Sequence, residues 1–259
     1  MAIGKSRVFQ KGERLMNERN EVIIKLLDRA DIKPGMRILD IGCATGEVTQ
    51  LAAERVGLQG EVIGIDMNQT LLEKAVENNQ YNHVSYQHYD IYQLPEALGQ
   101  FDVIIGRRVL MYLPDVAWAL RILKDFLKPE GIFCFQESDA INGGTGADEL
   151  PLHQTAIQWI WQTVAQEGGD IYIGQKLYNL LNDIGMKDID YFAEAVIHTS
   201  DDNDLEWLVG IMLPRMKEHH IVDETFSIET FKEELKAEEQ HNHSAFIRDM
   251  AFGIIGKMK

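Results

Sequence analysis

Short apolar segments alternate with amphipathic segments along the first half of the chain. Apolar runs of strand length stand at residues 37–41, 61–65, 84–88, 101–106 and 131–137. Between them, apolar residues recur at helical spacing over 47–56, 69–78 and 116–127. Strands separated by helices at this spacing predict right-handed βαβ crossovers and a mainly parallel sheet.

The pattern changes on both sides of this core. Residues 6–30 are predicted to form a helix, which ends before Pro34 and Gly35. After the glycine-rich loop at 142–146, we expect further helices at 152–166 and 174–184, then one that follows the acidic residues 201–204 and runs through 216, and one at 228–240. Two more strands are expected at 187–198 and 250–255. The whole chain, 1–259, is therefore predicted to be a single α/β domain with insertions.

Charge and cysteine content indicate which binding partners and which cellular compartment to expect. The formal net charge is -16, which repels phosphate backbones and disfavours nucleic acid as a partner. Cys43 and Cys134 lie far apart in apolar surroundings, so free thiols in a reducing compartment are expected. No apolar run is long enough to span a bilayer, and a cytoplasmic protein is predicted.

The most informative stretch is the turn that follows the first apolar run. Gly42 and Gly46 flank a tight turn between a strand and a helix, a unit that points backbone N–H groups at a ligand. Binding sites for NAD use G-x-G-x-x-G, and this spacing is not met here. Asp40 at the strand end would repel a pyrophosphate, whereas it suits the cationic sulfonium and ammonium groups of S-adenosylmethionine.

These residues resemble the first motif of the class I S-adenosylmethionine-dependent methyltransferases. The family pattern is acidic-x-Gly-x-Gly-x-Gly, and Asp40, Gly42 and Gly46 match it, with Ala44 in place of the middle glycine. The resemblance runs over 36–137 and is to the small-molecule type, which includes the ubiquinone and menaquinone pathway enzymes. It implies a Rossmann-like, doubly wound, mainly parallel seven-stranded sheet with helical cap insertions, and S-adenosylmethionine as cofactor.

The resemblance also assigns residues at the later strand ends. Asp66, followed by Met67, ends the second strand, where a carboxylate can accept hydrogen bonds from both ribose hydroxyls. The family places an acceptor for the adenine amino group at Asp90, and the N–H of Ile91 as a donor to the ring. Arg107 directly follows the fourth strand and is expected to touch the cofactor or the acceptor. Many relatives have a histidine where this chain has Tyr112.

The acceptor is expected beyond the carboxyl ends of the strands. Candidates there are the residues that follow the fourth and fifth strands: Arg107, Arg108, Tyr112, Glu137, Ser138 and Asp139. Arg108 has an alternative interpretation as a structural ion pair, and Tyr112 as a packing residue. We expect the helix at 1–30 and the insertions at 140–170 and 200–243 to cover the acceptor. His153 on the first insertion is a candidate base or a structural histidine, and Arg215 on the second could hold an acceptor carboxylate.

The predicted activity is methyl transfer to a small organic acceptor by in-line displacement. The alternatives are a non-catalytic cofactor-binding or interaction protein and an aminopropyl transferase. Methylation of bases or of glutamine is disfavoured, because Gly106-Arg107-Arg108-Val109 stands where an Asn/Asp-Pro-Pro-aromatic tetrapeptide would be expected. No metal site is predicted at the histidines near 219 and 241. The acceptor atom stays open, and a homodimer is compatible with the sequence.

Overall fold

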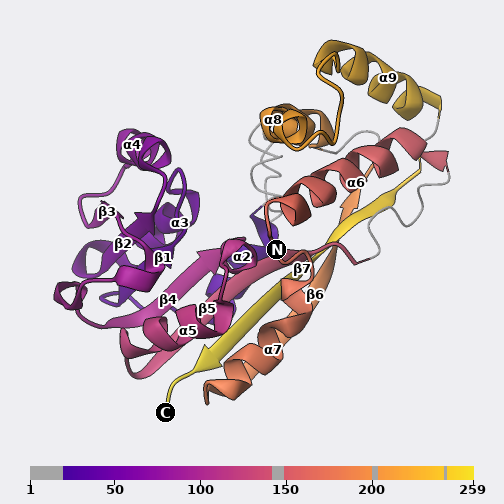
Figure 1. Cartoon of the computed structure of the whole chain (residues 1–259). Helices are drawn as coiled ribbons and strands as arrows, with labels where there is room; N and C mark the ends of the chain where they lie inside the picture. Colours follow the sequence, from indigo (N-terminus) through magenta and orange to yellow (C-terminus); the bar gives the residue numbers. More distant parts are fainter. Residues whose placement is uncertain (1–19, 142–148, 200–203, 242–243) are drawn as a thin grey trace, which may run out of the picture.

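The protein is built on one seven-stranded sheet with the strand order β3-β2-β1-β4-β5-β7-β6 (Figure 1). The computed structural model describes residues 20–141, 149–199, 204–241 and 244–259. The strands are β1 (Arg37–Ile41), β2 (Glu61–Asp66), β3 (Val84–His88), β4 (Phe101–Arg107), β5 (Leu127–Asp139), β6 (Lys187–His198) and β7 (Phe246–Lys257). Strand β7 runs antiparallel to both β5 and β6, whereas β1 to β5 pair in parallel.

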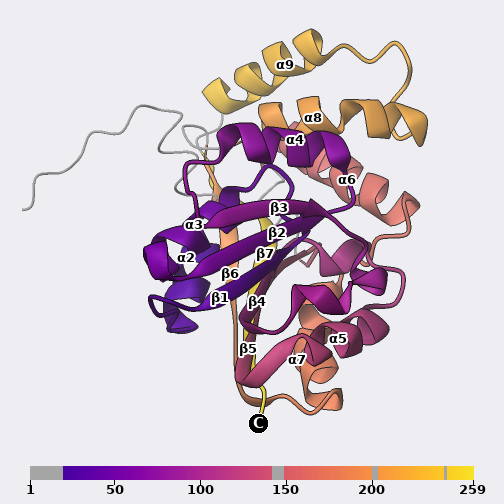
Figure 2. The same cartoon turned by 90° about the vertical axis from the view of Figure 1, so that its left-hand side faces the viewer.

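Helices cover both faces of the sheet (Figure 2). On one face, α2 (Glu21–Arg29) and α3 (Glu47–Val56) pack against the side of β1 that carries Ile38. On the other face, α5 (Val116–Asp125) and α7 (Ile173–Asp183) pack against the side that carries Leu39 and Ile41. Helix α4 (Gln69–Asn78) packs on β2 and β3. Because side chains alternate along a strand, the continuous apolar run of β1 feeds both layers.

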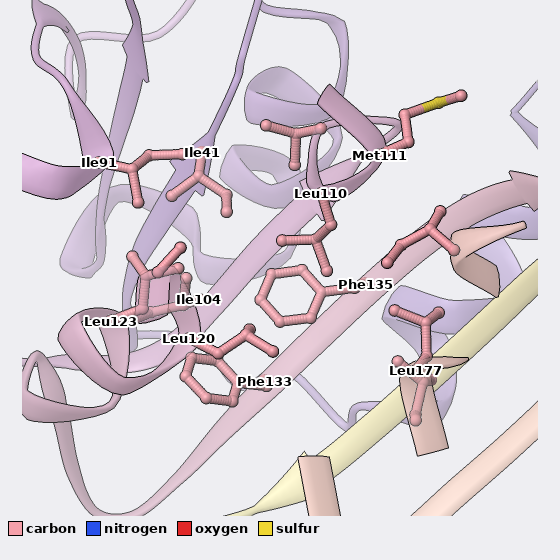
Figure 3. Close-up of a cluster of buried hydrophobic side chains, with 14 of the residues drawn as sticks. Ile41, Ile91, Ile104, Leu110, Met111, Leu120, Leu123, Phe133, Phe135 and Leu177 are labelled. Atoms are coloured by element: carbon pink, nitrogen blue, oxygen red, sulfur yellow. The ribbon is translucent and has the colours of Figure 1, made fainter. Parts of the chain in front are cut away.

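The larger core lies between the sheet and the helices α5 and α7 (Figure 3). Phe133 and Phe135 of β5 are fully buried there, with ring centroids 5.2 Å apart, and Leu120, Leu123 and Leu177 close over them. Each such side chain contributes about 1.5–3 kcal/mol of transfer free energy. Within the described residues, short 3-10 turns at Gly57–Gln59, Ile91–Gln93, Glu96–Leu98 and Leu110–Tyr112 form part of the connections.

Three further helices form a cap with an apolar core of its own. They are α6 (Pro151–Gln166), α8 (Leu205–Glu218) and α9 (Ile228–His241), and they gather beyond the end of the sheet at which β7 begins (Figure 1). Trp159 packs edge-on against Phe226 at a centroid distance of 5.5 Å. Because β7 is antiparallel, its first residues lie at the carboxyl edge of the parallel strands, so the cap adjoins that edge.

The predicted seven-stranded, mainly parallel fold with helical insertions is confirmed. The predicted boundaries were wrong by several residues in β5, which also includes 127–130, and in β7, which begins at Phe246 and not at 250. The predicted helix over 6–30 is described only from residue 20, and α2 begins at Glu21; residues 6–19 lie outside the described residues, as do the loop at 142–146 and the acidic residues 201–203.

The helices of the described part of the chain were compared with the length and apolarity that a bilayer requires. None of them is long and apolar enough to cross a membrane.

Candidate functional site

The turn after β1 is held in a conformation that excludes larger side chains. Gly42, Ala44 and Gly46 have φ values of 62°, 48° and 83°, a left-handed region that favours glycine. A Cβ on Gly42 would lie 2.6 Å from Cγ2 of Val109, and one on Gly46 would collide with the hydroxyl of Tyr86. The turn therefore presents bare backbone directly before the N-terminus of α3, as a site for a nucleotide-containing ligand requires.

Asp66 at the end of β2 fixes this turn from the neighbouring strand. Its Oδ2 accepts a hydrogen bond from the N–H of Ala44 (2.9 Å), and its Oδ1 accepts one from the N–H of Asn68 (2.8 Å). Each carboxylate oxygen can accept a second hydrogen bond, so capacity for two hydroxyl donors remains. Met67 is 64% exposed beside it. Asp66 and Met67, both predicted to bind the cofactor, thus lie next to the glycine turn.

Asp40 is buried beneath the turn and has an unusual acidity. Its Oδ2 accepts a hydrogen bond from the hydroxyl of Thr49 in α3 at 2.6 Å. Burial raises the pKa of Asp40 to about 7; the Thr49 hydrogen bond and the charge of Arg107 lower it, while Asp66 adds to the increase. Near neutral pH this carboxyl group therefore changes its charge state readily, and a nearby cation would favour the charged form.

Asp90 and Ile91 lie at the start of the 3-10 turn that follows β3. The side chain of Asp90 accepts a hydrogen bond from the N–H of Tyr92 (2.9 Å) and so caps this turn. Ile91 is buried in the larger core, where it lies near Ile41 (Figure 3). Strands β1, β2 and β3 are adjacent and parallel, so Asp90 stands at the same sheet edge as Asp66 and the glycine turn.

Arg107, the last residue of β4, joins three elements above the turn. Its guanidinium donates hydrogen bonds to Asn20 at the start of α2 and to Glu47 in the first turn of α3. Asn20 in turn donates to Glu47 at 2.9 Å. Arg107 therefore lies beside the glycine turn, and its predicted contact with the cofactor or the acceptor stays a prediction; neither Asn20 nor Glu47 was predicted to be its partner.

Two acidic residues at the end of β5 bind backbone N–H groups. Oε1 of Glu137 accepts from Val109 (3.0 Å) and Leu110 (2.8 Å), and burial raises the pKa of Glu137 to about 7 in spite of these hydrogen bonds. Asp139 accepts from Gly174 (2.6 Å) and Gln175 (3.0 Å) at the start of α7. Both carboxyl groups therefore hold chain segments in place next to the site.

The other candidates for catalysis occupy different surroundings. Tyr112 is 47% exposed, next to Arg215 of α8, and Arg215 forms an ion pair with Glu167 through Nε at 2.6 Å. His153 is buried inside the cap, where its Nδ1 lies 2.6 Å from Glu238 of α9. The contacts of His153 are those of a structural histidine, the alternative that its position on a helix had left open.

No cluster of three or more histidine, cysteine, aspartate or glutamate side chains suited to a metal ion occurs within the described ranges. His219 lies 3.6 Å from Glu167, and His241 contacts the carbonyl of Ala237, while residues 242–243 lie outside the described residues.

Sequence reasoning missed the charged residues at the start of β7. Arg248 and Asp249 are buried at the carboxyl edge, close to Arg108 and Ser138. A signal was present, because two adjacent charges interrupt an otherwise apolar segment. The predicted strand began at 250, however, and so left them out.

Comparison with known families agrees with this geometry. A family described as a methyltransferase domain matches residues 32–185, which is more than half of the chain. The chain belongs to this family. It is a class I S-adenosylmethionine-dependent methyltransferase domain, as the glycine turn and its resemblance had predicted.

Curated relatives of this methyltransferase domain match it over part of their length. An uncharacterized methyltransferase of Schizosaccharomyces pombe is 35% identical over 120 residues, which are 43% of this chain and 43% of the relative. Demethylmenaquinone methyltransferase of Bacillus cereus is 33% identical over 112 residues, 42% of this chain and 47% of the relative. The demethylmenaquinone methyltransferase of Staphylococcus aureus is 30% identical over 143 residues, which are 51% of this chain and 59% of the relative. The chain spans about half the length of the curated relatives it matches.

Solved structures resemble this methyltransferase domain over nearly its whole length. Phosphoethanolamine N-methyltransferase 2 of Haemonchus contortus, in complex with phosphomonomethylethanolamine and S-adenosylhomocysteine, has a TM-score of 0.57 at 18% identity and covers 92% of this chain and 53% of that chain. A SAM dependent methyltransferase of Aquifex aeolicus has a TM-score of 0.55 at 14% identity, with 97% and 100% covered. At these identities the likeness supports the fold alone.

Proposed function

We propose that the protein moves the methyl group of S-adenosylmethionine to a small organic acceptor. The observation that carries this proposal is the pairing of the left-handed glycine turn with Asp66, whose carboxylate bridges the turn and the end of β2. The demethylmenaquinone methyltransferases among the relatives, and the phosphomonomethylethanolamine bound by a protein of similar fold, support an acceptor of small-molecule size.

The cofactor-binding roles follow the order of the strands. Gly42, Ala44 and Gly46 admit the methionine end of the cofactor close to the backbone, and Asp40 supplies negative charge beneath it. In the family that this chain resembles, the ribose and adenine partners stand at positions that Asp66 with Met67, and Asp90 with Ile91, occupy here. The donor set fits a cation joined to adenosine, because carboxylates line the site and Arg107, the cation beside the turn, is itself paired with Glu47.

Arg107 has a positioning role in this scheme. Its hydrogen bonds to Asn20 and Glu47 hold the start of α2 against the first turn of α3, directly beside Gly46. The guanidinium thereby keeps the start of α2 next to the proposed cofactor site. It also faces Asp40, and its charge favours the ionised form of that carboxyl group.

The bound cofactor supplies an electrophilic methyl group, which an acceptor lone pair attacks while the methyl–sulfur bond breaks and its electron pair stays on sulfur. The chain's own contribution is alignment and exclusion of water, effects that can reach about 7–11 kcal/mol when orientation is ideal. A base is needed only for an acceptor that must lose a proton. Tyr112, at the edge between the sheet and α8, is the candidate for contact with the acceptor.

The cap is proposed to cover the acceptor. The N-terminal segment 1–30 and the insertions 140–170 and 200–243 supply α2, α6, α8 and α9, and the last three adjoin the carboxyl edge (Figure 1). Ligands of doubly wound sheets bind beyond this edge. Sequence differences in these segments would then set the acceptor, while the glycine turn sets the methyl donor.

The test is transfer of a radiolabelled methyl group. The protein is incubated with methyl-labelled S-adenosylmethionine and, separately, with the small-molecule, protein and nucleic-acid fractions of a cell extract. Label is expected in the small-molecule fraction, with stoichiometric release of S-adenosylhomocysteine. Label in only the protein or nucleic-acid fraction would contradict the proposed acceptor class, and cofactor binding without transfer to any fraction would favour a non-catalytic binding protein.

A further inference from the structure

A cluster of buried charges joins the sheet to the cap at the carboxyl edge. Arg248 of β7 donates a hydrogen bond to Asp204 at the start of α8 (2.6 Å) and another to Asp249 (3.2 Å). Asp249 also lies 3.9 Å from Nη2 of Arg108, which follows β4. The two carboxylates and two guanidinium groups thus sum to zero charge.

The inner part of this cluster is buried and paired, although Oδ1 of Asp249 and Nδ1 of His198 have no hydrogen-bond partner among the described residues. Arg248, Asp204 and Asp249 have side chains that are at most 10% exposed. Burial alone would raise the pKa of Asp204, but His198 and Arg248 lower it, so it stays ionised. Burial lowers the pKa of His198, which therefore adds no charge at neutral pH. The inner cluster links the start of α8 to β7.

Arg108 is the outward member of the cluster. Its side chain is 37% exposed, and its Nε donates a hydrogen bond to the hydroxyl of Ser138 in β5 (3.1 Å). A guanidinium has five N–H donors, and neither Nη group makes a hydrogen bond among the described residues; the contact with Asp249, at 3.9 Å, is an ion pair only. The guanidinium of Arg108 is thus oriented through Nε, and the N–H donors of its Nη groups remain available for a ligand.

The backbone of Arg108 is strained, whereas that of the preceding Arg107 continues strand β4. It has a φ of 54°, a region that costs a residue with a side chain about 1–3 kcal/mol, and its N–H is held by the carbonyl of Gln136 at 2.8 Å. Arg107 has its guanidinium on the cofactor side, with Asn20 and Glu47. The left-handed residue turns the second arginine to the opposite side, toward β5, β7 and the cap.

The cluster as a whole is neutral, so attraction of an anion to this position depends on the outward guanidinium of Arg108 itself. Burial and the charges of Arg248 and Arg107 lower the pKa of Arg108, while the carboxylates of Asp249 and Asp204 raise it. A guanidinium stays protonated under these conditions and pairs with carboxylate or phosphate through two parallel hydrogen bonds. Because the chain carries a net charge of -16, an anionic ligand would need such a cation to approach at all.

We propose that Arg108 binds an anionic oxygen group of the methyl acceptor, a carboxylate or a phosphate, with Ser138 and Asp249 holding its guanidinium in place. This assignment rests on the proposed function, since it places the acceptor beyond the ends of β4 and β5. It predicts acceptors that carry their negative charge away from the atom that receives the methyl group. Neutral analogues of the same shape are predicted to bind less tightly.

The test titrates acetate and inorganic phosphate, in separate arms, into the protein saturated with S-adenosylhomocysteine. Ionic strength is kept constant with chloride, and the arginine side-chain resonances are followed by NMR. A saturable shift of the Arg108 resonance is expected with at least one anion, and the arm that gives it identifies the chemistry. In Arg108→Gln, binding is expected to weaken by about tenfold or more, and in Arg108→Lys by less.

The matched control is Arg121→Gln, on the exposed face of α5, which should bind the anion as the wild type does. Each variant is first shown to bind S-adenosylhomocysteine with wild-type affinity. If it does, and neither anion gives a saturable shift, or Arg108→Gln and Arg121→Gln behave alike, the assignment of Arg108 is wrong while the proposed function stands. If the wild type itself fails to bind S-adenosylhomocysteine, the proposed function fails and this assignment with it.

Discussion

Asp40 is the residue of the proposed cofactor site whose charge state should respond most to a bound cation. Its ordinary pKa is 3.8, and burial raises the pKa to about 7. Near neutral pH both the protonated and the ionised form of this carboxyl group are therefore populated. A bound sulfonium cation favours the ionised form, so binding should lower the pKa and expel the proton.

We therefore predict that binding of S-adenosylmethionine near pH 7 releases a measurable fraction of a proton for each site. Because the deprotonated form attracts the cation, affinity should rise as the pH rises toward 8 and then level off. The measurement is isothermal titration in two buffers of different ionisation enthalpy. S-adenosylhomocysteine, which lacks the sulfonium charge, should release less. In Asp40→Asn the release should vanish, and the same observed enthalpy in both buffers for the wild type would contradict the role of Asp40.

At the scale of the elements, the cap is held together by a side chain of α9 that binds the free N–H groups in the first turn of α6. Leu150 precedes α6 and makes no side-chain hydrogen bond to its first turn. Glu238 of α9 takes this role, since its two oxygens accept from the N–H groups of Leu152 (2.8 Å) and His153 (3.1 Å). A carboxylate at a helix N-terminus is favoured by both the free N–H groups and the helix dipole.

Glu238→Gln should consequently loosen the cap. Loss of the charge weakens two hydrogen bonds to backbone N–H groups and the pair with His153, at an expected cost of about 1–3 kcal/mol. Hydrogen exchange measured by mass spectrometry should show faster exchange at the start of α6 and in α9, with the sheet unchanged. Glu234→Gln, on the exposed face of the same helix, is the matched control. Equal exchange in both variants would show that Glu238 does not hold α6.

The same elements show what a sequence pattern can and cannot predict. The strands β1 to β4 are short apolar runs that end in turn residues, so their positions and parallel pairing follow from local signals. Asp66 was predicted as a site residue because it directly follows such a run, and Asp90 because of the family resemblance. The partners of Arg107 and of His153 lie between 60 and 87 residues away along the chain. No local pattern encodes contacts of this kind, because they depend on how the elements pack.

At the scale of the whole molecule, the residues proposed to bind the cofactor and those proposed to bind the acceptor lie on different halves of the sheet. The half formed by β1, β2 and β3 carries the glycine turn and the carboxylates at the strand ends, whose chemistry suits a cationic adenosine derivative. The half formed by β4, β5 and β7 carries Arg108 and meets the cap through Arg248 and Asp204. Cofactor and acceptor are thus proposed to meet where β1 and β4 pair, at the centre of the carboxyl edge.

The most direct test of this account is the binding of S-adenosylhomocysteine to the wild type and to Asp66→Asn, measured by isothermal titration. We predict one site for each chain in the wild type. In Asp66→Asn the affinity should fall by the worth of a charged hydrogen bond to the ribose, about 1.5–3 kcal/mol. Asp183→Asn, on the exposed part of α7, should bind as the wild type does. Absence of binding to the wild type, or equal affinity in Asp66→Asn and Asp183→Asn, would contradict the cofactor site.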